Sequence, residues 1–133
     1  MAQAIRQLGE TTILRKLLDV AIAPAIVVVK GVAANSVKLP TAADVTFMGV
    51  TLENGAIAEL RDIAIDGGIV ACTAGAAIAE GDLVSIHGTT GKIKTAAPAT
   101  GANSFIVGVA MQAAAADGDI IGVLLARAVM QGA

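Results

Sequence analysis

The sequence predicts an all-β protein, a small β-barrel or sandwich of short strands with an N-terminal arm. Three observations lead to this fold class. Apolar runs of about four to eight residues, rich in Val and Ile, recur from residue 25 to residue 126. Glycine-rich turns separate these runs, as in Asp66-Gly67-Gly68 and Gly88-Thr89-Thr90-Gly91. The one alanine run with helical propensity, residues 113–116, is followed at once by the turn Asp117-Gly118-Asp119.

The first segment, residues 1–23, is expected to be an arm that contains a short helix. Four aliphatic residues fall on one helical stripe: Ile13, Leu14, Leu17 and Leu18. A helix of this length is marginal alone in water, so it either orders on docking or packs on its own domain. Pro24 ends the helix, and a β-barrel-like domain then occupies residues 24–133.

The strands of the domain follow from β-branched runs, alternation and turn residues. They are expected at residues 25–30, 37–39, 45–52, 60–65, 69–73, 83–87, 92–94, 104–112 and 120–126. There is also an internal echo. The sequence of residues 47–50 followed by 62–65 resembles that of residues 106–109 followed by 119–122. We interpret this echo as two similar hairpins that close one barrel.

Composition indicates a protein that is stabilised by assembly. The 133 residues fit one domain, and 56% of them are hydrophobic, but only Phe47 and Phe105 are aromatic. Small side chains bury little area, about 0.8 kcal/mol for each CH₂ group, so a monomeric core would be thin. We therefore expect an interface with further copies of the chain, or with another protein, to supply additional burial.

Several classes of partner are not expected. The net charge is −2, and the chain has neither a basic face nor stacking aromatics, which argues against nucleic acid. The longest apolar run, residues 20–29, is too short to span a bilayer and contains Pro24, and the N-terminus lacks the pattern of a signal peptide. We therefore expect a soluble protein without a membrane partner. The single Cys72, in an apolar run, is expected to be a buried, inert thiol.

The strongest local candidate for catalysis is Ser85 with His87. At a spacing of two they share one face of a strand, with Glu80 or Asp82 nearby. Side chains placed this way rarely meet with hydrogen-bond geometry, so the polar face of a hairpin beside its turn is the favoured interpretation. His87 is the only histidine, which excludes a His-based metal cluster.

The remaining carboxylates are expected to act in turns. Asp62 and Asp66 form one candidate acid/base pair, and Asp117 and Asp119 form another. Turn acids that accept backbone amides explain them better, and the second pair lacks the further ligands of a calcium loop. We therefore expect no enzymatic activity, no metal and no cofactor.

The order of the motifs resembles the capsid cement, or head decoration, proteins of tailed bacteriophages. The resemblance covers about residues 25–128. It rests on these segments: Phe47-Met48-Gly49-Val50, Asp62-Ile63-Ala64-Ile65-Asp66-Gly67, Ala76-Ala77-Ile78-Ala79-Glu80-Gly81-Asp82-Leu83-Val84-Ser85, Thr90-Gly91-Lys92-Ile93, Ile106-Val107-Gly108-Val109-Ala110 and Ile120-Ile121-Gly122-Val123-Leu124-Leu125. The most specific is Ala-Ile-Ala-x-Gly-Asp followed by a strand, a Gly-Lys turn and a strand. These are glycine and apolar patterns, not a catalytic signature.

The resemblance implies a small β-barrel-like structural protein on the outer surface of a virion head, made in the host cytoplasm. Such proteins commonly form trimers at threefold positions, where they clamp neighbouring major capsid subunits, and they have no active site. The N-terminal segment is longer than in the family. It either reaches across capsid subunits or stays within the trimer.

The predicted contact residues lie in this segment. Apolar side chains would bury and basic ones would meet carboxylates; the set is Arg6, Ile13, Leu14, Arg15, Lys16 and Leu17. Three other functions stay open: another head or tail component, a small β-barrel that binds a ligand or glycan, and an enzyme built on Ser85 and His87.

Overall fold

The structure, a computed structural model, describes residues 11–132, and all regular elements in this part are strands. The all-β class is therefore confirmed. The strands are β1 (Thr12–Leu18), β2 (Val27–Lys30), β3 (Ser36–Lys38), β4 (Gly49–Thr51), β5 (Leu60–Asp66), β6 (Ile69–Thr73), β7 (Leu83–His87), β8 (Lys92–Thr95), β9 (Asn103–Ala110) and β10 (Ile120–Gln131).

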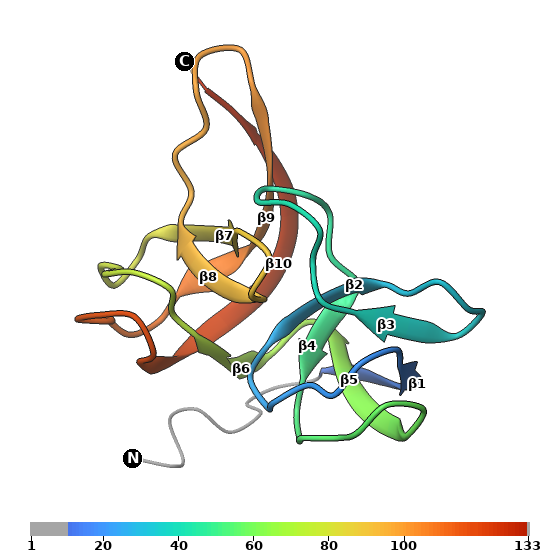
Figure 1. The fold of residues 1–133 in the computed structure, drawn as a ribbon. Helices are drawn as coiled ribbons and strands as arrows, with labels where there is room; N and C mark the ends of the chain where they lie inside the picture. Colours follow the sequence, from blue (N-terminus) through green and yellow to red (C-terminus); the bar gives the residue numbers. More distant parts are fainter. Residues whose placement is uncertain (1–10, 133) are drawn as a thin grey trace.

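The strands form two sheets that pack against each other (Figure 1). The first is a closed barrel in the order β1-β3-β2-β4-β5. The second has five strands in the order β6-β10-β9-β7-β8, and an isolated bridge between Ala74 and Ile93 connects its two ends. The long strand β10 runs through this sheet and on toward the 96–102 loop, where Gly132 bridges to Thr100 (Figure 1).

The expectation of a short helix around residues 13–18 is wrong, because this segment is strand β1. It pairs antiparallel with β5 from Ile13 opposite Ala64 to Leu17 opposite Leu60, and it pairs parallel with β3 at Leu17 and Leu18. Threonine and isoleucine at the start of the segment favour strand over helix. The barrel also supplies backbone partners that an isolated short helix lacks. The boundary between residues 23 and 24 stays a prediction.

Most other strands lie where they were expected. β6 and β7 have the predicted bounds, whereas β4 is limited to Gly49–Thr51 because residues 40–48 form the connection between β3 and β4, which contacts the second sheet through Asp44. β10 is longer than expected and contains a register shift between Leu125 and Ala128. The interpretation of the internal echo as one barrel is wrong, since β4 and β5 belong to the barrel and β9 and β10 to the second sheet.

Two apolar clusters form the core. The smaller one fills the barrel with aliphatic side chains: Leu18, Ile22, Ile26, Val28, Val37 and Ile63. The larger one joins Val27, Val50 and Ala64 of the barrel to β-branched residues of the second sheet, such as Val84 and Ile86. Because this cluster contains residues from both sheets, the two sheets share one hydrophobic core.

Cys72 lies fully buried in the larger cluster, as the sequence predicts. Burial disfavours the thiolate and raises the pKa of the thiol to about 12.

Arg127 of β10 fixes the 40–48 connection and the barrel to the second sheet. Its Nη1 donates to the Phe47 carbonyl at 2.5 Å, and its Nη2 donates to the carbonyls of Met48 at 2.6 Å and Ile65 at 3.0 Å. The guanidinium carbon also lies 4.0 Å from the centre of the Phe47 ring, a cation–π distance. One side chain therefore holds backbone groups of the connection and of β5 in register with β10.

Candidate functional surface

β1 carries five of the six predicted contact residues, and Arg6 lies outside the described residues. Because alternate residues of a strand face opposite sides, Leu14 and Lys16 share the face of buried Leu18, while Ile13, Arg15 and Leu17 share the other. The exposed fractions are 38% for Ile13 and 45% for Leu14. The structure therefore keeps these residues on one strand but divides them between its two faces instead of along one stripe.

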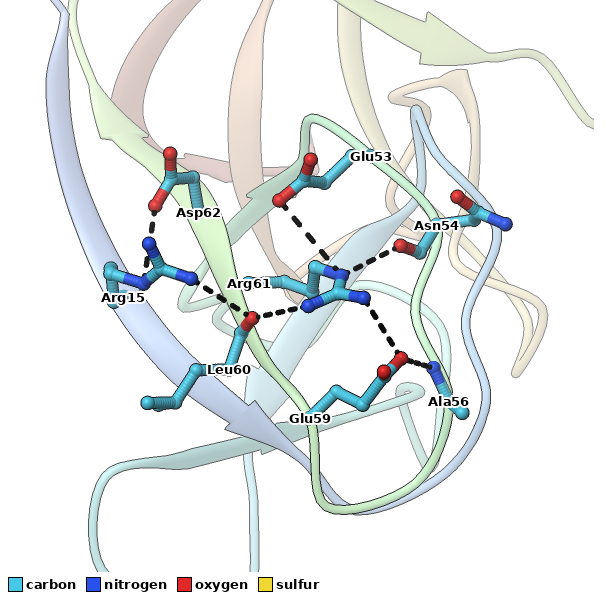
Figure 2. Close-up of polar contacts among 8 residues, drawn as sticks. All are labelled: Arg15, Glu53, Asn54, Ala56, Glu59, Leu60, Arg61 and Asp62. Atoms are coloured by element: carbon cyan, nitrogen blue, oxygen red, sulfur yellow. Dashed lines mark hydrogen bonds and ion pairs between the residues drawn. The ribbon is translucent and has the colours of Figure 1, made fainter.

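Arg15 contacts strand β5 (Figure 2). Its Nε lies 3.7 Å from Asp62 Oδ1, and its Nη2 donates to the Leu60 carbonyl at 3.2 Å. Arg61 Nη1 donates to the same carbonyl at 2.7 Å. Both partners of the Arg15–Asp62 pair are well exposed, so this pair contributes no more than about 1 kcal/mol to stability. Its effect is to orient the arginine along the surface.

Arg61 organises the 53–59 loop beside the end of β1 (Figure 2). Its Nε donates to the Asn54 carbonyl at 2.9 Å, and its Nη2 lies 3.0 Å from Glu59 Oε1. The same Glu59 oxygen accepts the Ala56 amide at 2.6 Å, and Glu53 lies 3.9 Å from Arg61 Nε. These contacts close the loop on itself although each exposed ion pair is weak.

The fixed loop presents apolar side chains that the sequence analysis missed. Ile57 is 67% exposed, and Leu60, opposite Leu17, is 44% exposed. The available signal was an isoleucine inside the turn sequence Gly55-Ala56-Ile57-Ala58. We call Ile13, Arg15, Ile57 and Leu60 the β1 surface; Leu14 lies on the other face of the strand. Apolar residues together with arginine are a composition typical of protein interfaces.

β1 pairs with β3 along only a short part of its length. The Leu17 N–H donates to Asn35, on the β3 side, so the backbone groups of Ile13 and Arg15 point to that side too. Among the described strands, β3 pairs with β1 only at Leu17 and Leu18. Among the described residues, the closure of the barrel between β1 and β3 therefore rests on a short ladder.

Ser85 is buried and bonded to an aspartate, not to His87. Its Oγ donates to Asp44 Oδ1 at 2.9 Å, and Ser104 Oγ donates to the same oxygen at 2.7 Å. Lys94 Nζ lies 3.2 Å from Asp44 Oδ2. Partial burial raises the pKa of Asp44, but the hydrogen bonds from Ser104, Ser85 and Lys94 outweigh burial and lower it. This arrangement clamps the 40–48 connection to the second sheet.

His87 packs against Gly75, where a Cβ atom would lie 2.7 Å from Nδ1. Since the Ser85 hydroxyl donates to a carboxylate and no hydrogen bond joins it to His87 among the described contacts, the pair lacks the geometry of an activated nucleophile.

The aspartates that the sequence offered as acid/base pairs have different partners in the structure. Asp119 Oδ2 accepts the amides of Ala115 at 2.8 Å and Ala116 at 3.2 Å, as expected for a turn acid. Asp117 pairs with Lys92 Nζ at 2.8 Å, and this hydrogen bond lowers its pKa. Asp62 pairs with Arg15 instead of with Asp66.

Grooves lie beside the 40–48 connection. One of about 310 Å³ lies between Phe47, Phe105, Arg127 and Val129. The guanidinium of Arg127 is already bonded to three carbonyls, so the groove offers mainly apolar contact.

Within residues 11–132, no three His, Cys, Asp or Glu side chains gather as metal ligands do. None of the described residues forms a helix that is long and apolar enough to cross a membrane.

Comparison with known proteins identifies the family. A family model described as phage cement protein matches residues 15–125, from the middle of β1 to β10. This chain belongs to the phage cement protein family. It is accordingly a structural protein of the phage capsid, and the resemblance in the order of the motifs is confirmed.

A solved structure has the same fold as this cement protein. It is the crystal structure of the head fiber gp8.5 N base in bacteriophage phi29, with a TM-score of 0.65 and 14% sequence identity. The match covers 92% of this chain and 99% of the other. No curated protein sequence matches. Neither the family nor this neighbour points to a ligand- or glycan-binding module.

Proposed function

We propose that this cement protein binds the outer surface of the phage head, contacts neighbouring major capsid subunits and stabilises the shell without a catalytic step. The observation that carries the proposal is the family match over residues 15–125. The mixed apolar and charged β1 surface supports the proposal. Its apolar side chains are exposed to solvent, as is typical of a surface that a partner covers. The protein would be made in the host cytoplasm and would act as a homo-oligomer, a trimer.

The β1 surface is the proposed capsid contact. Ile13 and Ile57 would bury against a capsid subunit, and Arg15 would meet a carboxylate on it. Leu14 and Lys16, on the other face of β1, would make a separate apolar and ionic contact. Leu17 lies next to exposed Leu60 on β5 and would extend the contact. Arg6 would add a further cation near the start of the chain.

Stabilisation would come from many modest contacts acting together. An oligomer that binds a repeating lattice makes its second and third contacts intramolecularly, so weak individual contacts combine to a strong attachment. Closed symmetry among identical chains is the usual form of such an oligomer.

The test is co-sedimentation of the purified protein with expanded heads from the same phage that lack it. We expect saturable binding at a fixed ratio to the major capsid protein. Ile57→Lys should weaken this binding about tenfold or more, because it places a charge in the proposed contact. Val129→Lys is the matched control, since Val129 is 57% exposed but lies on β10, outside the β1 surface.

Two results would contradict the proposal. If the protein does not bind to heads that lack it, the proposed binding to the capsid is wrong. Equal losses for both variants would show that the β1 surface is not the contact. Removing residues 1–23 is unsuitable for this purpose, because it would delete strand β1 from the barrel.

A further inference from the structure

We propose that Asn54 is a site of spontaneous deamidation that the fold keeps unreactive until the 53–59 loop opens. Asn54 is exposed, and the next residue is Gly55. Glycine has no Cβ atom to hinder the approach of its backbone nitrogen to the preceding side chain, so this pair can close a succinimide ring. The modification goes beyond the proposed function and requires no partner protein, cofactor or metal.

The only other reactant is water. The Gly55 nitrogen attacks Asn54 Cγ, a C–N bond forms, and the side-chain nitrogen leaves as ammonia together with the proton of the Gly55 amide. Water then adds to either carbonyl carbon of the succinimide and breaks its bond to the nitrogen, which regains a proton. Opening at Cγ gives aspartate. Opening at the former backbone carbonyl gives isoaspartate, in which the chain runs through Cγ and is longer by one methylene group.

The side chain of Asn54 is available for this reaction. The backbone carbonyl of Asn54 accepts Arg61 Nε at 2.9 Å, whereas no hydrogen bond among the described contacts holds the side-chain amide. Figure 2 shows that this amide points away from Arg61. The side chain itself is therefore not what keeps the site unreactive.

The Gly55 nitrogen is the protected atom. Its N–H donates to the Ile22 carbonyl at 3.0 Å, and the Gly55 carbonyl accepts the Ile22 amide at 3.0 Å. Ile22 is 4% exposed and belongs to the smaller core cluster. The nitrogen must lose its proton to attack, and a proton bonded to a buried carbonyl is released only when the local structure opens. The bridge to Ile22 therefore has to break before Asn54 reacts.

Packing requires glycine at position 55. A Cβ atom there would lie 2.6 Å from Leu18 Cδ1 and 2.8 Å from Arg61 Cγ. Leu18 is fully buried in the barrel, so it cannot move aside without disturbing close-packed neighbours. The barrel thus imposes the glycine that makes Asn54 reactive, and the same contact shields the pair.

Glu59 holds the loop closed around the reactive pair. Its Oε1 accepts the Ala56 amide at 2.6 Å and lies 3.0 Å from Arg61 Nη2. Glu53, on the other side of Asn54, lies 3.9 Å from Arg61 Nε and accepts no backbone amide among the described contacts. The two glutamates share a charge and an ion-pair partner, but only Glu59 closes the loop. They therefore form a matched pair for mutation.

Deamidation would alter the surface around the loop. Either product adds a carboxylate beside Glu53 and Glu59, which among the described residues share Arg61 as their ion-pair partner. The longer chain of isoaspartate would also displace Gly55 from its bridge. Because this loop presents Ile57, isoaspartate should weaken binding to heads, a consequence that rests on the proposed function.

The test is incubation of the full-length protein at mildly alkaline pH, either native or unfolded in guanidinium chloride, followed by peptide mapping with mass spectrometry. In the unfolded chain, Asn54 should deamidate before Asn35 and Asn103, since both are followed by serine, whose Cβ atom hinders the attack. In the native protein, Asn54 should deamidate more slowly by about tenfold or more. Asn54→Gln is the chemical control, because glutamine must close a larger ring and should leave this peptide unchanged.

The glutamate variants test the role of the loop. Glu59→Ala should speed deamidation of the native protein about threefold or more, because the loop loses a backbone hydrogen bond. Glu53→Ala should change the rate by less than about twofold. Urea unfolding establishes that both variants are folded under the incubation conditions.

Three results would overturn the inference: native Asn54 deamidates as fast as in the unfolded chain, Asn35 or Asn103 reacts first in the unfolded chain, or the two glutamate variants react at the same rate. None of these measurements uses heads. Failure of the proposed function appears separately, as unmodified protein that does not bind heads.

Discussion

At the scale of single residues, Asp44 shows how one half-buried side chain joins distant parts of the chain. Its carboxylate accepts two serine hydroxyls and lies beside Lys94, while its own backbone bridges the carbonyl of Ile86 and the amide of Phe105. Its φ angle is 60°, in the left-handed region that Asn and Asp tolerate best. The residue type is therefore required for both its backbone conformation and its charge.

Asp44→Asn isolates the charge, because asparagine keeps the shape and the backbone preference. We expect a loss of about 1–3 kcal/mol in the free energy of unfolding near neutral pH, since an amide cannot accept as the carboxylate does beside Lys94. Urea unfolding measures it. The control is Asp62→Asn, which removes a carboxylate from an exposed pair and should cost less than about 1 kcal/mol.

The pH dependence of this variant follows from the lowered pKa of Asp44. A carboxyl whose pKa is lower in the folded state stabilises the fold above its unfolded pKa, near 3.9, and loses that contribution as pH falls through the folded pKa. The difference between Asp44→Asn and the unmodified protein should therefore shrink as the pH falls below the unfolded pKa and through the lower folded pKa. A difference that does not change with pH would mean that the charge is not the cause.

At the scale of secondary structure, β1 is a strand of the barrel. Leu18, at its end, is 1% exposed and packs in the smaller core cluster, whereas Leu14 on the same face is 45% exposed. The two leucines therefore separate the role of β1 in the fold from its role on the surface.

Leu18→Ala should lower the free energy of unfolding by about 2–5 kcal/mol, because it leaves a cavity in the barrel. Leu14→Ala, the same change on the same strand, should cost less than about 1 kcal/mol. Urea unfolding of both variants decides the matter. If both variants lose the same small amount of unfolding free energy, β1 contributes little to the fold. That result would favour an independent arm over a strand of the barrel.

At the scale of the whole molecule, the shared core couples the barrel to the second sheet. The larger cluster contains residues of both sheets, and Arg127 bonds backbone groups of the 40–48 connection and of β5. A chain of this size with one core should unfold in a single cooperative transition.

Cys72 reports on that transition. In the native protein it is fully buried and its pKa is about 12, so a thiol reagent near neutral pH should hardly react with it. In increasing urea, the labelled fraction should follow the loss of the circular dichroism of the strands. Labelling that precedes this loss would show that the second sheet opens independently of the barrel.

The part of the fold that was predictable from sequence is the part with local causes. β6 and β7 begin and end as expected because turn residues flank them on both sides, as Asp66-Gly67-Gly68 does before β6. β1 was misassigned because its paired apolar residues at 13, 14, 17 and 18 fit a helix as well as a strand. The segment forms a strand because it pairs with β5, some 45 residues away in the chain.

The candidate surface was partly predictable for the same reason. Ile13, Leu14 and Arg15 were named from the sequence, but Ile57 and Leu60 become neighbours of β1 only through the pairing of β5 with β1 and the contacts of Arg61. The predicted role of these residues in binding remains to be measured on heads.

The sequence by itself determined the all-β class, the positions of most strands, the burial of Cys72 and the resemblance to phage cement proteins. Alternation, turn residues and motif order are all properties of short segments. Only the tertiary structure decided that there are two sheets with one shared core and that the Ser85 hydroxyl donates to Asp44. It also decided that the Gly55 amide pairs with the carbonyl of Ile22. The reason is that these features depend on the register between strands far apart in the chain, where a shift of one residue would turn each side chain to the opposite face.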